Sequence, residues 1–170
     1  MYNKLQYISQ GDTVKEQLYN IHQALDHGCD WIQLRFKNQK TNKSFALAEA
    51  VHFLCEEYLA NFIVNDDVHL AEHIAADVVK IIGATANTLE DVLSHINNGC
   101  DYIGLGPYQF TKTKANLSPI LGLGGYQSIL NQLNPKQKET PIYAIGGITL
   151  ENVDELVATG IHGIAVSGII

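Results

Sequence analysis

A short phrase recurs along the chain, and it constrains the fold more than any other feature of the sequence. It reads HGCDWIQLR at 27–35, NGCDYIGLG at 98–106 and TGIHGIAVS at 159–167. In the stretch before the second copy, LEDVLSHINNG, apolar residues recur at i, i+3, i+4 and i+7, which is the apolar stripe of a helix. Each copy carries a glycine at the place where a helix end favours a left-handed residue. The repeat therefore predicts a helix, a glycine stop and a short buried strand.

Repetition of this unit predicts an α/β fold in which helices cover a sheet of parallel strands. Eight strands in strict alternation would make a (β/α)8 TIM barrel, and 170 residues suit a single domain over 1–170. We expect strands near 4–9, 30–36, 61–65, 77–80, 80–85, 101–106, 141–145 and 162–166. We expect helices near 13–27, 44–59, 67–74, 88–98, 125–133 and 149–159.

The chain is short for such a barrel, which typically takes about 250 residues and rarely fewer than about 200. Strand-like sequence runs from ADVV at 76–79 into KIIGAT at 80–85 without a break, although parallel neighbours need a crossover of a dozen or more residues. Either 76–85 is one long strand or a connection is missing between Val79 and Lys80. The last strand is also not followed by a final helix.

Composition and charge exclude several classes of protein. Eleven Lys and Arg against eighteen Asp and Glu give a net charge of −7, which opposes binding to nucleic acid or to acidic membranes. No apolar run approaches the roughly 20 residues that span a bilayer, and the first residues do not resemble a signal peptide. The three cysteines lack any CxxC spacing, so a reducing, cytoplasmic location fits best.

Three polar residues, Gln33, Arg35 and Lys37, end the second predicted strand at a spacing of two. Period two places them on one face, which at the carboxyl end of a barrel strand points into the mouth where ligands bind. A solvated strand end with a structural salt bridge is the alternative. Three polar groups in register, one of them a planar guanidinium, favour phosphate oxygens instead.

The third and fifth predicted strands also end in polar residues. Asn65 and Asp66 stand immediately before a predicted helix, so they could cap it, or Asp66 could hold Mg²⁺ beside bound phosphates. Thr85 and Asn87 follow the same pattern and could bond a substrate or cap the next helix. Each of these polar strand ends is by itself weak evidence for a binding site.

A long segment, 107–124, follows the sixth predicted strand and gathers two hydroxyls and two cations between Thr111 and Lys114. An exposed loop is the alternative, but loops of this length in compact barrels are usually functional. The last two predicted strands end in Gly146–Gly147 and Ser167–Gly168. In barrels the backbone N–H groups at these two strand ends form the usual phosphate site. No set of side chains for nucleophilic catalysis stands out.

Seven motifs, taken together and in order, closely resemble the thiamine phosphate synthase family over nearly the whole chain. They are QLRFK at 33–37, IVNDD at 63–67, IGATANT at 82–88, DYIGLGP with TKTK at 101–114, LGLGGY at 121–126, AIGGIT at 144–149 and GIAVSGI at 163–169. The resemblance implies a (β/α)8 barrel that joins hydroxymethylpyrimidine pyrophosphate to a thiazole phosphate and releases pyrophosphate. It also implies small-molecule substrates, and pairing of barrels as a homodimer is a candidate assembly.

The resemblance also implies a role for individual residues. The pyrimidine pyrophosphate would be held by Gln33, Arg35, Lys37, Asn65, Thr85 and Lys114. Mg²⁺ would be bound by Asp66. The thiazole phosphate would be held by Thr111, Lys112, Thr113, Gly147, Val166 and Ser167. The catalytic step would fall to Arg35, Lys37, Thr85 and Lys114, whose polar groups surround the departing pyrophosphate.

Three departures from the family pattern bear on this interpretation. The segment that brings a second Mg²⁺ carboxylate after the fourth strand is missing where Val79 meets Lys80, and the final helix is absent. Thr85 replaces the usual serine but keeps the hydroxyl. Two alternatives therefore stay open: a barrel related to the thiazole tautomerases, which only transfer protons, and a non-catalytic barrel that binds phosphate.

Overall fold

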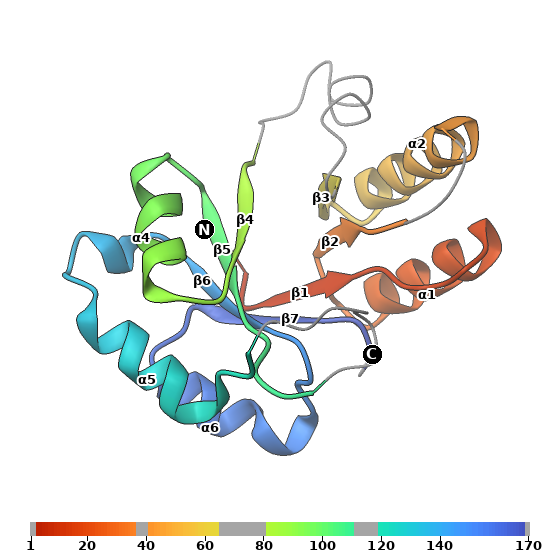
Figure 1. Ribbon diagram of the computed structural model, residues 1–170. Helices are drawn as coiled ribbons and strands as arrows, with labels where there is room; N and C mark the ends of the chain where they lie inside the picture. The colour runs from red at the N-terminus through yellow and green to blue at the C-terminus, as the bar shows by residue number, and fades with distance from the viewer. Residues whose placement is uncertain (1–2, 37–40, 65–80, 111–118, 169–170) are drawn as a thin grey trace. The chain divides into compact units, whose positions relative to one another are not determined.

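The structure is a computed structural model, and the residues it describes are 3–36, 41–64, 81–110 and 119–168. They form two compact units (Figure 1). The first unit comprises Leu5–Lys80 and Val166–Ile170, and the second comprises Met1–Lys4 and Ile81–Ala165. The interpretation of 1–170 as one domain stays a prediction.

The first unit alternates strands and helices, as the repeat predicts. Its elements are β1 (Leu5–Ile8), α1 (Val14–Asp26), β2 (Trp31–Leu34), α2 (Thr41–Glu57) and β3 (Asn61–Val64). The strands are parallel in the order β3-β2-β1, with Tyr7 opposite Ile32 and Ile32 opposite Phe62. Parallel neighbours need a long crossover, and α1 and α2 supply it.

The core of the first unit lies between its strands and its helices. Successive side chains of a strand point to opposite faces, so Tyr7 and Ile32 share one face of the sheet. They are buried together with Ile21 of α1 and Leu47 of α2 in one apolar cluster. Each such side chain contributes roughly 1.5–3 kcal/mol to folding. The opposite face carries Gln33, which places this polar side chain away from the helices.

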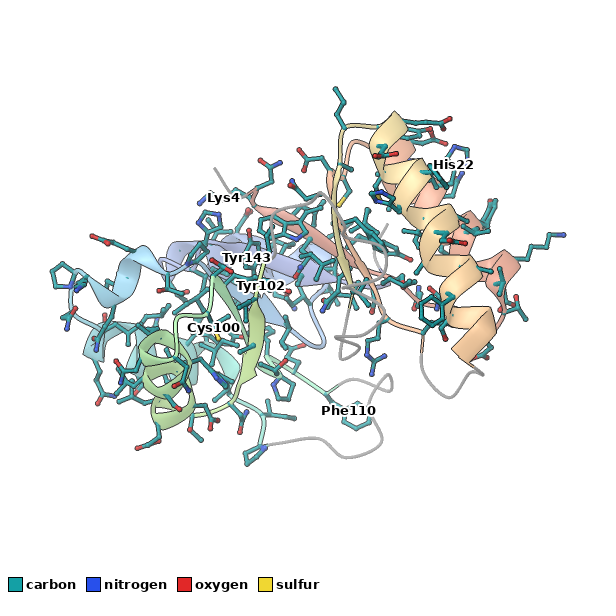
Figure 2. The ribbon with its side chains drawn as sticks, turned by 90° about the horizontal axis from the view of Figure 1, so that it is seen from above. Lys4, His22, Cys100, Tyr102, Phe110 and Tyr143 are labelled. Carbon is teal, nitrogen blue, oxygen red and sulfur yellow. The ribbon has the colours of Figure 1, made fainter. Side chains whose placement is uncertain are left out.

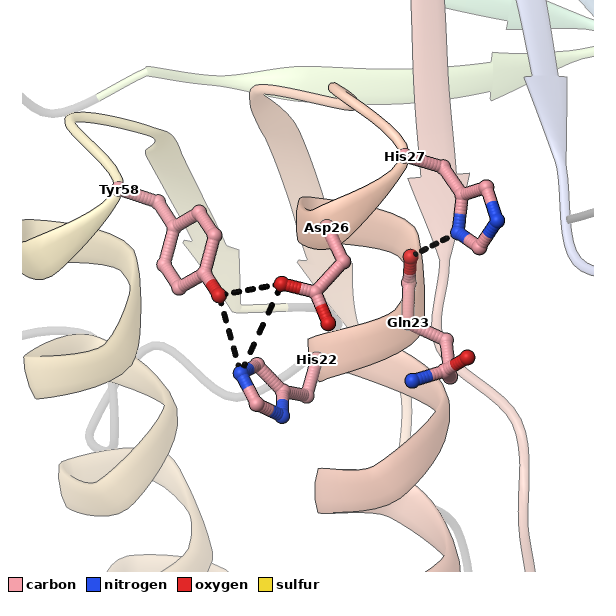
Figure 3. A network of polar contacts seen from close by, with 5 residues as sticks. All are labelled: His22, Gln23, Asp26, His27 and Tyr58. Carbon is pink, nitrogen blue, oxygen red and sulfur yellow. Dashed lines mark hydrogen bonds and ion pairs between the residues drawn. The ribbon is translucent and has the colours of Figure 1, made fainter.

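A polar network joins the ends of α1 and α2 on the surface of the first unit (Figure 3). The hydroxyl of Tyr58 donates to Oδ1 of Asp26, and Nε2 of His22 lies 3.0 Å from the same hydroxyl. The hydrogen bond to Asp26 raises the pKa of Tyr58, because it stabilises the neutral phenol. Both helix ends lead into the amino ends of strands, so this network lies away from the strand ends where ligands are expected.

The second unit contains four parallel strands in the order β7-β6-β5-β4. Its elements are β4 (Gly83–Ala86), α4 (Leu89–Asn97), β5 (Tyr102–Leu105), α5 (Gly122–Gln132), the short 3-10 helix η1 (Gln137–Glu139), β6 (Ile142–Ile145), the short 3-10 helix η2 (Leu150–Asn152), α6 (Val153–Ala158) and β7 (Gly163–Val166). The register places Thr85 opposite Gly104, and Gly104 opposite Tyr143. These three residues therefore share one face of the sheet.

Aromatic rings fill the amino end of that face in the second unit (Figure 2). Tyr102 and Tyr143 meet edge to face, with ring centroids 5.9 Å apart. The ring of Tyr102 lies over Gly83, where an added Cβ would be 2.1 Å from the tyrosine Cζ. A side chain at this position would displace the tyrosine ring, and the packed rings leave polar chemistry to the carboxyl ends of the strands.

The repeated helix ends have the geometry that the sequence predicts. Thr13 and Thr88 begin α1 and α4 with capping boxes, in which the threonine hydroxyl accepts from the backbone of Glu16 or Asp91 and that carboxylate accepts in return. The glycine of each copy has a positive φ, which only glycine adopts without strain. These values are +85° at Gly28, +76° at Gly99 and +90° at Gly160.

The two capping carboxylates predict a loss of stability in acid. The backbone N–H of Thr13 lowers the pKa of Glu16, and the backbone N–H of Asn87 lowers that of Asp91. A depressed folded-state pKa contributes stability that is present above the unfolded-state pKa of about 4 and is lost as pH falls through the folded value. Chemical denaturation between about pH 5 and 2 should show less acid destabilisation for the double variant Glu16→Gln, Asp91→Asn than for the parent chain.

The control for this prediction is Glu90→Gln, which changes an exposed carboxylate in the first turn of α4. This carboxylate makes no hydrogen bond with the described residues. The Glu90 variant should follow the parent chain through the acid range. Equal acid sensitivity of the double variant and the parent would contradict the assignment to the capping boxes.

The strand near 80–85 begins later than predicted, at Gly83. Ile82 lies outside β4 because its N–H donates to Oδ2 of Asp101 at 2.7 Å, while its carbonyl accepts from the Asp101 N–H at 2.8 Å. The interpretation of 76–85 as one unbroken strand is therefore wrong at residues 81–82. The predicted strand 77–80 and helix 67–74 lie outside the described residues.

Candidate active site

The backbone around Arg35 is held by the end of the neighbouring strand. The Arg35 N–H donates to Oγ of Ser9 at 2.9 Å, and the Ser9 N–H donates to the carbonyl of Gln33 at 2.8 Å. Gln33 and Arg35 are both half-buried and, two residues apart, share one face. The part of the chain that the structure describes supplies no carboxylate partner for the guanidinium. Arg35 is thus positioned by its backbone, and no described carboxylate competes with an anion for its charged group.

Gln17 of α1 completes this arrangement, and sequence reasoning missed it. Its side-chain amide is 1% exposed and donates to the carbonyls of Gly11 at 2.8 Å and Arg35 at 3.4 Å. The amide therefore ties the segments that follow β1 and β2 to each other. A signal was present, because a polar residue in the buried stripe between Val14 and Ile21 needs a partner.

Thr85 lies at the carboxyl end of β4 and is exposed. Its carbonyl accepts from Nε2 of His95 at 3.1 Å, which fixes the backbone. Its strand neighbour is Gly104, which has no side chain to cover the threonine hydroxyl. Among the described residues that hydroxyl has no hydrogen-bond partner, so it can donate to or accept from a ligand.

Gly146 and Gly147 form a tight turn at the carboxyl end of β6, with φ values of +81° and +73°. The Gln109 N–H donates to the carbonyl of Gly146 at 3.0 Å, and a Cβ on Gly147 would lie 2.7 Å from the carbonyl oxygen of Gln109. The N–H of Gly147 makes no hydrogen bond within the described ranges. A bare backbone donor in a turn without side chains suits a phosphate oxygen.

The other predicted site residues are placed less completely. Val166 ends β7 and is buried, and Ser167 follows it half-buried. Both belong to the first unit and Gly147 to the second, so their meeting at one phosphate stays a prediction. Seven predicted residues lie outside the described residues: Lys37, Asn65, Asp66, Thr111, Lys112, Thr113 and Lys114.

One cavity of about 300 Å³ lies in the second unit, at the opposite ends of its strands. Lys4, Pro141 and His162 are among its lining residues, and they precede β1, β6 and β7 (Lys4 is labelled in Figure 2). Ligands of parallel barrels bind at the carboxyl ends, so this cavity is separate from the candidate site. No described helix could cross a membrane, and no described cluster of acidic, histidine or cysteine side chains could hold a metal ion.

The sequence matches one family along almost its entire length. Residues 5–81 and 78–170 each match the sequence model described as thiamine monophosphate synthase. The chain belongs to this family. The thiamine monophosphate synthase match confirms the resemblance that the seven motifs indicated, and it includes every predicted site residue.

Members of the thiamine monophosphate synthase family from several organisms are similar to the chain. It is 58% identical to thiamine-phosphate synthase of Flavobacterium johnsoniae, over 100% of this chain and 89% of that protein. It is 56% identical to thiamine-phosphate synthase of Flavobacterium psychrophilum, over 100% of this chain and 92% of that protein. The solved structure of thiamine phosphate pyrophosphorylase from Pyrococcus furiosus gives a TM-score of 0.78 at 30% identity, over 96% of this chain and 85% of that one. This likeness confirms the α/β class with parallel strands.

The thiamine monophosphate synthase match also divides close to the place where a connection was predicted to be missing. Its two parts meet at residues 78–81, where Val79 is followed by Lys80. The alignment with the Flavobacterium johnsoniae protein spans 189 positions against 170 residues here, a difference of 19. Relatives therefore contain residues without a counterpart in this chain. The small size of the chain compared with a typical barrel predicted such a difference.

Proposed function

We propose that this chain is a transferase of thiamine biosynthesis that joins hydroxymethylpyrimidine pyrophosphate to a thiazole phosphate. The products are thiamine phosphate and pyrophosphate. The observation that carries the proposal is the family match along both parts of the chain, with 58% identity to a relative named thiamine-phosphate synthase. The anion-binding groups at the carboxyl ends of β2 and β6 support it.

The pyrimidine pyrophosphate is assigned to polar residues that follow four of the strands. The planar guanidinium of Arg35 donates to two phosphate oxygens at once, and the amide of Gln33 lies on the same face. The hydroxyl of Thr85 bonds a further oxygen. Asn65, Lys37 and Lys114 complete the set as the family resemblance implies. The positive charges of Arg35, Lys37 and Lys114 attract a strongly anionic substrate, which the net negative charge of the chain would otherwise repel.

The reaction needs no nucleophile from the protein. The bond between the pyrimidine methylene carbon and the pyrophosphate oxygen breaks, and its electron pair leaves with pyrophosphate. The thiazole nitrogen then donates its lone pair to the methylene carbon, which forms the new carbon–nitrogen bond. Arg35, Lys37 and Lys114 stabilise the negative charge that develops on the leaving oxygen, and this is the step that they accelerate.

Mg²⁺ is the proposed cofactor, and Asp66 is the proposed ligand. Ile63 of β3 lies opposite Gln33 of β2, so the two strands end at the same edge of the sheet, and Asp66 follows β3 in the sequence. Carboxylate and phosphate oxygens are the ligands that Mg²⁺ prefers, which fits an acidic residue at this position. When bound, the ion neutralises charge on the pyrophosphate.

The thiazole phosphate is assigned to the glycine turn after β6 and to the segments that resemble its site in the family. The N–H of Gly147, which has no partner among the described residues, donates to a phosphate oxygen. Thr111, Lys112 and Thr113 supply hydroxyls and a cation, and Val166 and Ser167 contribute from the end of β7. The two substrates are thus assigned to different strand ends.

The test of this function is pyrophosphate release from the purified chain. We expect release only when both substrates and Mg²⁺ are present, loss of release with a chelator, and recovery when Mg²⁺ is restored. Absence of release despite tight binding of both substrates would instead support a phosphate-binding barrel. Isomerisation of a thiazole carboxylate phosphate without pyrophosphate release would support the tautomerase alternative.

We also propose that the chain works in the reducing cytoplasm. Cys29, Cys55 and Cys100 are free thiols, and burial raises the pKa of Cys55 to about 12. Little of that thiol is ionised near neutral pH, so it is a packing group and not a reactive one.

Pairing as a homodimer stays a prediction.

A further inference from the structure

The side chain of Asn87 bridges two backbone carbonyls that flank the segment assigned to the thiazole phosphate. Its Nδ2 donates to the carbonyl of Gly106 at 2.9 Å and to the carbonyl of Pro119 at 2.9 Å. A primary amide has two N–H groups, and both are used here. Gly106 precedes the segment 107–118 and Pro119 follows it. One side chain at the end of β4 therefore joins the entry and the exit of that segment.

We propose that Asn87 is a positioning residue that sets where the segment between Gly106 and Pro119 returns to the second unit. The proposal rests on the proposed function, because it concerns the segment that carries Thr111 and Lys112. The sequence left Asn87 as either a substrate ligand or a helix cap. The geometry points to neither role, since the cap of α4 is Thr88 and both amide hydrogens face the backbone.

Asn87 is itself fixed by the start of α4. Its backbone N–H donates to Oδ2 of Asp91 at 3.0 Å, and Thr88 donates to the same oxygen at 3.0 Å. The capping box of the helix thereby holds the backbone from which the amide projects. Two of its dihedral angles remain for the amide to adjust, and two hydrogen bonds constrain them.

The entry and the exit of the segment are held differently. On the entry side, the N–H groups of Tyr108 and Gln109 donate to the carbonyls of Ile145 and Gly146 at the end of β6, at 2.9 and 3.0 Å. On the exit side, the Leu121 N–H donates to the carbonyl of Pro107 at 3.0 Å. This bond joins the exit to the entry of the same segment and not to a strand of the sheet. Asn87 is thus the side chain through which the exit is attached to the end of β4.

The chemistry of the two acceptors explains why an amide stands here. Two carbonyl oxygens need two donors, and a carboxylate of the same shape would face them with two further acceptors. Asn87→Asp therefore preserves size and replaces attraction by repulsion. Asn87→Ala removes both donors. Asn87→Ser keeps a single donor on a shorter side chain.

The first measurement is amide hydrogen exchange by NMR in the chain without substrates. In Asn87→Ala and Asn87→Asp we expect the N–H of Leu121 and of Gly122 to exchange about fivefold to tenfold faster, because each lost hydrogen bond eases local opening. The N–H of Tyr108, which is bonded to β6, should change much less. Asn97→Ala is the matched control, since it removes an exposed asparagine amide of α4 that makes no hydrogen bond with the described residues.

The second measurement is steady-state kinetics of pyrophosphate release. We expect Asn87→Ala to raise KM for the thiazole phosphate about tenfold, with partial recovery in Asn87→Ser. Exchange at Leu121 that is equal in Asn87→Ala and Asn97→Ala would overturn the proposal. If the alanine variant does not fold, the same comparison between Asn87→Ser and the parent chain decides it. A parent chain without turnover contradicts the proposed function and leaves the exchange result to decide the role of Asn87.

Discussion

Replacing Arg35 with alanine is expected to lower kcat/KM for pyrophosphate release by on the order of 10²-fold or more, the loss typical of a group aimed at developing charge. Arg35 is the only arginine in the chain. Its backbone is held on one side by Ser9 and on the other by Gln17, at 2.9 and 3.4 Å. The backbone that carries the guanidinium is therefore fixed, and none of the three lysines in the proposed site has the planar donor geometry of an arginine.

Two further variants separate this effect from a general loss of charge or of fold. Arg35→Lys keeps the cation and loses the second parallel hydrogen bond, so its activity should lie between those of the parent chain and the alanine variant. Lys15→Ala removes a cation from an exposed position on α1 and should retain full activity. Steady-state rates with both substrates and Mg²⁺ measure all three. Unchanged kcat/KM in Arg35→Ala would remove the residue from the proposed site.

Replacing Gly147 with alanine is expected to be the most damaging single-methyl change at the second anion site. The residue has a φ of +73°, and the new Cβ would lie 2.7 Å from the carbonyl oxygen and 2.8 Å from the carbonyl carbon of Gln109. The backbone conformation alone costs about 1–2 kcal/mol for a residue with a side chain. The contact adds about 1–3 kcal/mol, because the neighbour is backbone and cannot rotate away.

Gly160→Ala is the matched control for this change. Its φ is +90°, and an added Cβ would meet nothing within 4 Å. It therefore carries the conformational cost without the contact. Urea denaturation should show a larger fall in the free energy of unfolding for Gly147→Ala by about 1–3 kcal/mol, and KM for the thiazole phosphate should rise only in that variant. Equal stability of the two variants would mean that the turn after β6 yields easily and is not a rigid phosphate cradle.

The elements were predictable because their signals are local. The repeated glycine stops, the helical stripe before 98–106 and the threonines that begin α1 and α4 all lie within a few residues of the structure they specify. The start of β4 was not predictable in this way. It depends on Asp101, which is nineteen positions from the Ile82 N–H that it accepts from. A contact of that span leaves no periodic pattern in the sequence.

The same distinction between local signals and long-range contacts applies to the residues of the candidate site. Arg35, Thr85 and Gly147 could be found from residue type and position at a strand end, since the charge, the hydroxyl and the bare backbone are properties of the residues themselves. Gln17 and Asn87 could not be assigned from sequence, because their roles depend on which distant carbonyls their amides reach. Arg35 is eighteen positions from Gln17, and Pro119 is thirty-two positions from Asn87.

The sequence by itself thus determined the alternation of strands and helices and the family, and it predicted the residues with anion-binding chemistry and a missing connection after Val79. The tertiary structure alone decided which groups hold those residues in place. The physical reason is that propensity, periodicity and side-chain chemistry act over a few residues. A buried amide must instead find its acceptors wherever the fold brings them, because an unpaired polar group in the interior costs more than the hydrogen bond it forms.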